Sequence, residues 1–322
     1  MIFLSKKSIL TKLLYWQRSF LMRDYFYLAL YKSFSFLLKI LPNKTVITLT
    51  KGIAKFAYTL SKKHQNIINN NLDLAFNHTL SIDEKKAIGV AAFENLTDTT
   101  FGIMKRDKMK KSDVIKNVTF ENDDIVKKYQ QEGKQFIFVT GHFGNWELLS
   151  QSIAIHFDLT LVGVGRELDS KVMDDILIKN RERFNVEMVY KKGAMKGCIR
   201  AISQKKIIGI LVDQHLPLEQ SINVDFFDHK VTHTPIASIL SRKFNIDLIP
   251  AFISTDDYEH YKIKIYSPIK SIKTENQEED LEKITKAQAH AMETVIREKP
   301  KQWFWMHKRW KEFYKKELYE NK

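Results

Sequence analysis

The stretch Gln135–Leu149, QFIFVTGHFGNWELL, combines a strand, a turn and a helix start within a few residues. Residues 136–139 form a short apolar run with the composition of a buried β-strand. Two glycines then favour a turn, and the amphipathic residues after them predict a helix. His142 is therefore expected in the turn, and Glu147 in the first turn of the helix.

This spacing allows His142 and Glu147 to act together. Five residues along one continuous helix would point the two side chains roughly 140° apart. From the turn, the imidazole can instead fold back over the helix start and reach the carboxylate. A carboxylate bonded to one ring nitrogen fixes the tautomer and leaves the other nitrogen as a base. The alternative is that His142 is a turn residue with ordinary hydrogen bonds, and that Glu147 is a solvated carboxylate at the helix start, where the helix dipole favours it.

Basic residues are concentrated at the N-terminal end. The 322 residues carry a formal net charge of +14 at pH 7. Residues 1–72 hold twelve Lys or Arg and one acidic residue, and so contribute +11 of this charge. Such an end favours nucleic acid, an anionic membrane surface or an acidic protein as partner. Because its lysines alternate with leucines and aromatic residues, the pattern is typical of a membrane interface.

Residues 25–41 are the candidate for a membrane span. Their 17 residues lie at the lower limit for crossing a bilayer. Lys32, near the centre, costs a few kcal/mol on insertion scales. We therefore expect a monotopic helix in preference to a single N-terminal span. No small-residue cleavage site follows the apolar run, which argues against a signal peptide.

The chain is expected to divide into a membrane-associated helical segment, residues 1–60, with breaks at Pro42 and Gly52, and a domain of residues 61–322. In this domain, strands alternate with amphipathic helices, which predicts an α/β fold with a mostly parallel central sheet flanked by helices. The predicted helices cover 62–76, a segment that begins at the capping box Ser81–Glu84, 170–184, 193–204, 235–244 and 280–298, and the predicted strands cover 136–139, 159–164, 186–190, 207–212, 248–253 and 261–266.

Polar residues follow three of these strands. His142 follows one strand, Arg166 the next and Asp213 a third. Because chemistry gathers beyond the carboxyl ends of parallel strands, we expect the three side chains to face one crevice. Each residue can also have a local role that involves only its sequence neighbours, which is its local interpretation. Arg166 can pair with Glu167 or Asp169 at the surface, and Asp213 can be an ordinary turn aspartate.

Other kinds of site find little support. The single cysteine, Cys198, excludes an internal disulfide. With no H-E-x-x-H motif, the ten histidines give no closed set of metal ligands. There is also no Walker loop and no G-x-G-x-x-G motif. We therefore expect no metal, no nucleotide and no cofactor.

Several segments resemble one enzyme family in the same order along the chain. GHFGNWE, at 141–147, is similar to the H-x-x-x-x-[DE] block of the lysophospholipid acyltransferase superfamily. Its final Glu makes it most similar to the late acyltransferases of lipid A biosynthesis. The segments around Arg166 and Asp213 resemble the next two blocks of that family. Residues 300–310, PKQWFWMHKRW, resemble its C-terminal signature, and the whole resemblance extends over roughly residues 60–312.

Two positions depart from the family pattern. Lys301 replaces the usual Glu of the C-terminal signature. Asp228-His229 stands where a glycine-containing turn is usual, so the geometry of this turn is left open. Taken without the family, the C-terminal segment can be a helix docked on the core, or an interfacial belt with a phosphate contact.

The resemblance implies an O-acyltransferase that moves a fatty acyl chain from acyl-acyl carrier protein to a hydroxyl of a lipid A precursor. It also implies a location at the cytoplasmic face of the inner membrane. The implied partners are acyl carrier protein, the lipid A precursor and inner-membrane lipids, with no nucleic acid. His142 would be the general base, and Glu147 would orient it. The implied substrate-binding residues are Arg166, Asp213, Asn145 and Gly144.

Alternatives stay open at this stage. The acceptor could be another glycolipid or a lysophospholipid, and neither the acyl chain length nor the acylated hydroxyl follows from the sequence. A non-enzymatic basic protein that binds a membrane surface or nucleic acid would explain the charge, but not the placement of His142, Arg166 and Asp213. For an acidic carrier protein, the candidate docking clusters are Lys191-Lys192 and Lys308-Arg309.

Overall fold

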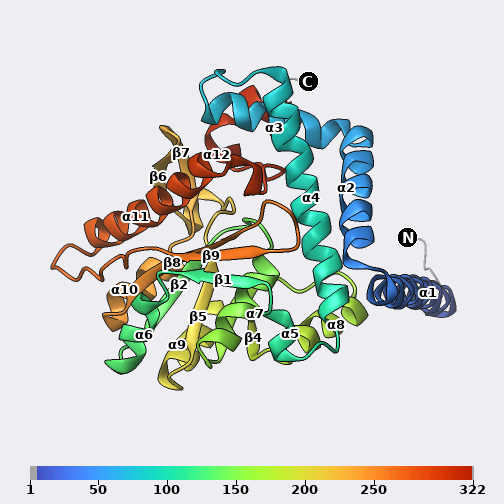
Figure 1. The fold of residues 1–322 in the computed structure, drawn as a ribbon, viewed down its shortest axis with the longest axis horizontal. Helices are drawn as coiled ribbons and strands as arrows, with labels where there is room; N and C mark the ends of the chain where they lie inside the picture. Colours follow the sequence, from blue (N-terminus) through green and yellow to red (C-terminus); the bar gives the residue numbers. More distant parts are fainter. Residues whose placement is uncertain (1–5, 321–322) are drawn as a thin grey trace.

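A computed structural model describes residues 6–320, which fold around one seven-stranded sheet (Figure 1). Only the pairing of β8 with β9 is antiparallel, so the predicted mostly parallel α/β sheet is confirmed. In sheet order the strands are β1 (Val118–Glu121), β9 (Tyr261–Ile265), β8 (Asp247–Ser254), β2 (Phe136–Thr140), β5 (Ile207–Leu211), β3 (Leu161–Gly165) and β4 (Val186–Tyr190).

Helices cover both faces of the sheet, because its central strands carry apolar side chains in both directions. Phe136 and Phe138 of β2 pack in one cluster with residues of α7. Ile137 and Val139, which point the other way, pack in another cluster with residues of α9, α10 and α11. The helices after the N-terminal pair are α3 (Lys62–Ala75), α4 (Ile82–Arg106), α5 (Lys111–Val114), α6 (Asp124–Gln131), α7 (Trp146–His156), α8 (Lys171–Glu182), α9 (Ala194–Ser203), α10 (Ile236–Phe244), α11 (Gln277–Glu298) and α12 (Lys311–Lys315).

The long helix α4 begins at the predicted capping box. The Ser81 hydroxyl accepts a hydrogen bond from the Glu84 backbone N–H, and the Glu84 carboxylate accepts one from the Ser81 backbone N–H at 2.8 Å. Both bonds satisfy donors that the first turn of a helix leaves unpaired.

The N-terminal segment forms two helices, α1 (Lys6–Ile40) and α2 (Asn43–Leu60), and α2 packs along α4 (Figure 1). Pro42 separates them, as predicted. Gly52 does not break α2, so that prediction is wrong. A helical glycine costs only about 1 kcal/mol, which packing on α4 can offset. Among the described residues, no helix has the length and apolar character needed to cross a membrane.

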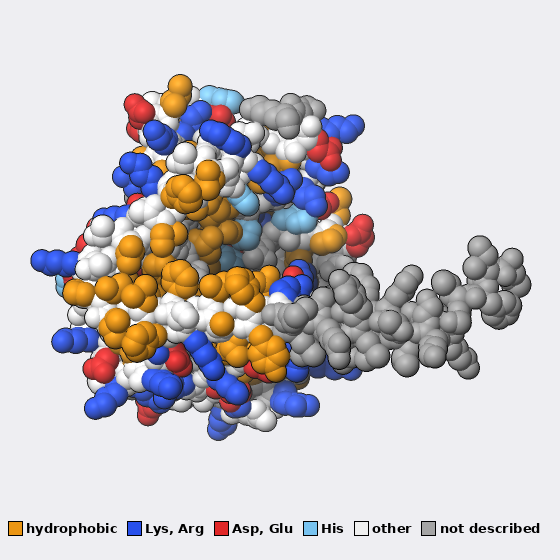
Figure 2. Space-filling model, turned by 90° about the vertical axis from the view of Figure 1, so that its right-hand side faces the viewer, with side chains coloured by type: hydrophobic (Ala, Val, Ile, Leu, Met, Phe, Trp, Pro, Cys, Tyr) orange, Lys and Arg blue, Asp and Glu red, His pale blue; other side chains and the backbone are white. Residues whose placement is uncertain are grey.

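The N-terminal helices carry most of the exposed apolar side chains. Twelve of the fifteen exposed large hydrophobic residues described lie on α1 or α2. Figure 2 shows a band of hydrophobic side chains across the face formed by these helices. On its inner side, α2 contributes Ala54 and Tyr58 to one core with α3, α4 and the C-terminal tryptophans. The boundary at residue 60 stays a prediction.

A two-stranded hairpin, β6 (Ile222–Phe226) and β7 (His229–His233), stands apart from the main sheet, and its strands were not predicted. The pairing of Phe226 with His229 leaves a two-residue turn. Both turn residues have positive φ, 53° at Phe227 and 61° at Asp228. This is the conformation that usually selects Asn-Gly, and here neither residue is glycine.

Candidate active site

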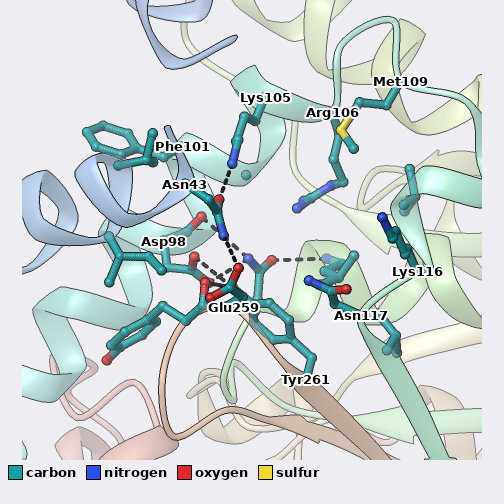
Figure 3. A pocket seen from close by; sticks show the side chains of 18 of the residues that line it. Asn43, Asp98, Phe101, Lys105, Arg106, Met109, Lys116, Asn117, Glu259 and Tyr261 are labelled. Carbon is teal, nitrogen blue, oxygen red and sulfur yellow. Dashed lines mark hydrogen bonds between the residues drawn. The ribbon is translucent and has the colours of Figure 1, made fainter. Parts of the chain in front are cut away.

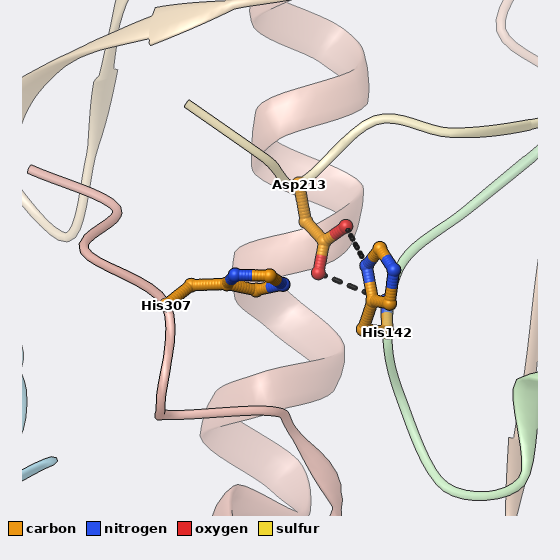
Figure 4. Close-up of side chains that lie close together, drawn as sticks. All are labelled: His142, Asp213 and His307. Atoms are coloured by element: carbon orange, nitrogen blue, oxygen red, sulfur yellow. Dashed lines mark hydrogen bonds and ion pairs between the residues drawn. The ribbon is translucent and has the colours of Figure 1, made fainter. Parts of the chain in front are cut away.

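His142 and Asp213 meet at the carboxyl ends of two neighbouring strands. β2 pairs with β5 in parallel, so the residues that follow them lie side by side. Nδ1 of His142 lies 2.8 Å from Oδ1 of Asp213 (Figure 4). The backbone N–H of His142 donates to Oδ2 of the same carboxylate at 2.8 Å. Asp213 therefore fixes both the ring and the backbone of His142.

The carboxylate of Asp213 is buried, with 1 % of its surface exposed. Burial alone would raise its pKa, but the His142 imidazole and the Trp303 indole N–H, which donates at 2.9 Å, hold the pKa well below its usual range. An ionised carboxylate on Nδ1 keeps the proton there. Nε2 of His142 is then the ring nitrogen that carries a lone pair.

The C-terminal segment holds the loop that carries His142. The Phe304 N–H donates to the His142 carbonyl at 2.9 Å, and the Gly144 N–H donates to the Gln302 carbonyl at 2.8 Å. Gly144 has a φ of +53°, and a Cβ there would lie 2.2 Å from the Ile253 carbonyl oxygen. Only glycine therefore fits this position.

Glu147 does not contact the histidine. Its carboxylate forms a two-pronged ion pair with Arg181 of α8, with Nε of Arg181 at 3.0 Å from Oε2. Burial would raise the pKa of Glu147, but the Arg181 guanidinium lowers it. The predicted hydrogen bond between His142 and Glu147 is therefore wrong. A side chain in the first turn of α7 points toward α8, while the imidazole turns toward β5.

Asn145 belongs to a separate polar cluster under α2 and α4 (Figure 3). Its Oδ1 accepts from the Leu148 N–H at 3.0 Å and so caps α7, while its Nδ2 donates to Asp98 at 2.8 Å. It does not line the cavity that contains His142. Its place in the structure is that of a helix cap, and its contact with substrate stays a prediction.

A mostly apolar cavity of about 280 Å³ opens beside His142. It runs between the sheet and helices α7 and α8. Figure 2 shows histidine side chains inside a hollow bordered by hydrophobic side chains. Such a cavity suits an alkyl chain whose polar end reaches the base. Its apolar lining includes Phe138, Leu149, Ile153, Leu161, Leu177, Val186, Met188 and Leu211.

The family model for bacterial lipid A biosynthesis acyltransferases matches residues 15–312 of this chain. The chain belongs to this family. It is 21% identical to a lipid A biosynthesis acyltransferase of Haemophilus influenzae over 290 residues, 89% of this chain and 88% of that protein. It is 23% identical to a lipid A biosynthesis lauroyltransferase of Escherichia coli over 278 residues, 84% of this chain and 87% of that protein.

Within this acyltransferase, the predicted residues separate into three groups. His142 and Asp213 are brought together. Arg166 lines the same cavity, but its side chain is 80% exposed and pairs with Asp169 at 2.9 Å, as in its local interpretation. Glu147 is held by Arg181, and the N–H of Gly144 is already used by Gln302.

The C-terminal signature is docked on the core through its tryptophans, as one interpretation predicted, but it is not the predicted helix: the 3-10 helix η2 ends at Gln302 and the next helix, α12, begins at Lys311. Trp303, Trp305 and Trp310 are fully buried. Arg309 is 1 % exposed and donates to the carbonyls of Gln214 and Thr232, so it cannot dock a carrier protein as predicted.

Four residues of the acyltransferase site were missed as members of it: Arg181, Gln214, Trp303 and His307. Their partners lie between 34 and 93 residues away in sequence. Three of them could have been found from their positions in the sequence. Gln214 directly follows Asp213, and Trp303 and His307 belong to the C-terminal signature. Nothing in the helix around Arg181 distinguishes this residue from a surface arginine.

His142, Asp213 and His307 bring one possible ligand atom each within 4.8 Å of one another (Figure 4). The sequence suggested no such set. Hydrogen bonds already use both Asp213 oxygens and Nδ1 of His142, and the Gln214 amide lies beside Nε2 of both histidines.

Proposed function

We propose that this protein transfers an acyl chain from acyl-acyl carrier protein to a hydroxyl of a lipid A precursor. The observation that carries the proposal is an imidazole, fixed by a buried carboxylate, at the mouth of an apolar cavity. Family membership supplies the lipid class. The acceptor oxygen and the thioester would meet at Nε2 of His142.

In the proposed reaction, Nε2 of His142 takes the proton of the acceptor hydroxyl as its oxygen attacks the thioester carbonyl. A C–O bond forms and the C–S bond breaks. The imidazolium, stabilised by Asp213, returns the proton to the leaving thiolate. No covalent enzyme intermediate and no cofactor are needed, and Arg166 is proposed to exchange Asp169 for a substrate phosphate.

We also propose that the protein lies on the cytoplasmic face of the inner membrane through α1 and α2. The support is their row of exposed apolar side chains together with the basic charge of this part of the chain. An apolar face beside lysines is typical of helices that lie in a membrane interface. A lipid acceptor could then reach the hollow above α1 without leaving the bilayer.

An acidic carrier protein is proposed to dock at the ends of β3 and β4. Lys191 and Lys192 are exposed there, and the Lys191 N–H donates to the Gly165 carbonyl next to Arg166. We expect Lys191→Glu/Lys192→Glu to raise KM for the carrier-bound donor, and the effect to fade as salt rises. The matched control is Lys127→Glu/Lys128→Glu on α6, before the amino end of β2. An equal rise of KM for the carrier-bound donor in both double variants would contradict docking at Lys191 and Lys192.

The decisive experiment incubates the purified protein with acyl-acyl carrier protein and bacterial lipid extract, and identifies the product by mass spectrometry. An acylated lipid A precursor is expected. An acylated glycolipid or lysophospholipid would assign another acceptor. If no acylated product forms, the proposed acyl transfer is wrong. His142→Ala is expected to lower the rate by about 10²–10⁴ while thermal unfolding stays unchanged.

A further inference from the structure

Two imidazoles converge on one side-chain amide in this site. Nε2 of His142 lies 3.3 Å from Nε2 of Gln214, and Nε2 of His307 lies 3.4 Å from the same atom. In the tautomer whose Nδ1–H donates to Asp213, Nε2 of His142 carries a lone pair and no proton. The Gln214 amide must therefore donate to it.

The same amide makes Nε2 of His307 an acceptor. Burial and the neighbouring His142 together lower the pKa of His307 to about 4, so the ring is neutral near pH 7. Its place is fixed, because the His307 carbonyl accepts from Asn71 at 2.7 Å and the ring packs edge-on against Phe304. Two lone pairs on fixed rings thus point at one position.

Gln214 is the replaceable member of the group. Its side chain is exposed, and within the described part of the chain it has no hydrogen bonds other than those to the two rings. Only its backbone is held, through the Arg309 guanidinium. A ligand with suitable donors can therefore displace the amide while both imidazoles stay in place.

We propose that the acceptor replaces this amide and is bound by both imidazoles. Its reacting hydroxyl donates to Nε2 of His142, and a second O–H or N–H of the same molecule donates to Nε2 of His307. The preferred acceptor is then a hydroxyl whose molecule carries a second O–H or N–H within reach of Nε2 of His307, in preference to an alcohol without one. This inference rests on the proposed acyl transfer.

The proposal gives Gln214 a second consequence. A water molecule also has two donors and would fit between the rings, where His142 could use it to hydrolyse the thioester. The amide occupies this position until an acceptor arrives. Gln214→Ala should therefore raise hydrolysis of acyl-acyl carrier protein in the absence of acceptor, a change that a merely structural glutamine would not produce.

The test compares two amphiphiles of the same chain length, a 1,2-diol and its 2-O-methyl ether. Both are measured as acceptors, and as inhibitors of transfer to the lipid extract, so that an unreactive compound still reports binding. One neutral hydrogen bond predicts that the wild type prefers the diol about three- to tenfold. His307→Phe, which keeps a ring but has no lone pair, should abolish this preference. His307→Gln, which offers a carbonyl acceptor, should keep part of it.

Equal use of diol and ether by the wild type would overturn the inference, as would a diol preference that persists in His307→Phe. If His307→Phe does not fold, the wild-type ratio and His307→Gln decide. Absence of any transfer to lipid by the wild type would instead defeat the proposed function. The two failures are therefore distinguishable.

Discussion

Two buried carboxylates near His142 differ in their partners, and this decides what each can do. Asp213 touches the imidazole, while Glu147 neutralises Arg181 and ties α7 to α8. Removing the charge of Asp213 should therefore affect chemistry. Removing the charge of Glu147 should lower the stability of the fold first, because the mostly buried guanidinium of Arg181 loses its counter-charge.

Asp213→Asn is expected to lower turnover by about 10²–10⁴, because an amide can stabilise the wrong tautomer of His142. The asparagine side-chain oxygen can still accept the hydrogen bond from the Trp303 indole N–H, so the thermal unfolding midpoint should change little. Steady-state rates and unfolding curves of the same preparation check both statements. A well-folded Asp213→Asn with near-normal turnover would show that the base does not need this carboxylate.

Glu147→Gln is expected to destabilise the protein by about 3 kcal/mol, and to lower turnover per folded molecule much less than Asp213→Asn does. Denaturant unfolding and active-site-normalised rates measure this. Replacing both partners, as Glu147→Met/Arg181→Met, should recover much of the stability. If Glu147→Gln instead unfolds normally and loses turnover as severely, Glu147 assists His142 during catalysis despite its resting contact with Arg181.

At the scale of elements, strands and helices with clear periodicity could be predicted, and their order in the sheet could not. The end of β2 was expected to share a crevice with the end of β5, but not to be its direct neighbour. Glu147 was paired with His142 because it is close in sequence, whereas the observed partner lies 71 residues away. The hairpin was missed because its turn, Phe227-Asp228, lacks the glycine that marks such turns.

That turn supports a stability prediction. Asp228 has a φ of 61°, and its carboxylate is 3.8 Å from Arg297 in an exposed pair that contributes little. Asp228→Gly should stabilise the protein by about 0.5–1 kcal/mol, because glycine adopts positive φ without strain. Asp228→Ala is the matched control and should destabilise. Equal unfolding midpoints for both variants would contradict this account of the turn.

The helices α1 and α2 support a prediction on membrane binding. Phe36 and Phe56 are each 66% exposed. If both insert into the interface, Phe36→Ser/Phe56→Ser should weaken binding to anionic vesicles at least about tenfold, since each buried Phe contributes about 1.5 kcal/mol or more. Vesicle flotation measures this. Leu218→Ser, an exposed leucine outside α1 and α2, should leave binding unchanged, and equal losses would contradict the assignment.

For the molecule as a whole, buried histidines set the response to acid. Burial lowers the pKa of His233 to about 3, and that of His307 to about 4. The unfolded chain takes up both protons near pH 6.5, so their stabilising contribution is present above this pH and is lost on acidification. Burial raises the pKa of Asp98 to about 6, so the folded protein takes up this one proton before the unfolded chain does. Asp98 therefore stabilises the fold as the pH falls.

The unfolded chain gains two protons on His233 and His307, whereas the folded protein gains one on Asp98. The free energy of unfolding should therefore fall as pH drops from about 6.5 to about 4. Denaturant titrations at several pH values measure the slope. His233→Gln removes one of the two protons and should make the slope shallower. A free energy of unfolding that is constant or rises over this range would contradict the roles of these histidines.

The hydrogen bonds that Gln302 and Phe304 make with the loop of His142, and that Trp303 makes with Asp213, have a consequence for biosynthesis. The indole that fixes Asp213 and the backbone that fixes His142 belong to residues 302–304, far behind α1 and α2 in the order of translation. His142 and Asp213 therefore cannot be fixed before residues 302–304 have been synthesised. By then, the apolar N-terminal helices have long emerged and can have met a bilayer. Activity would thus begin only after the helices proposed to bind the membrane have been exposed.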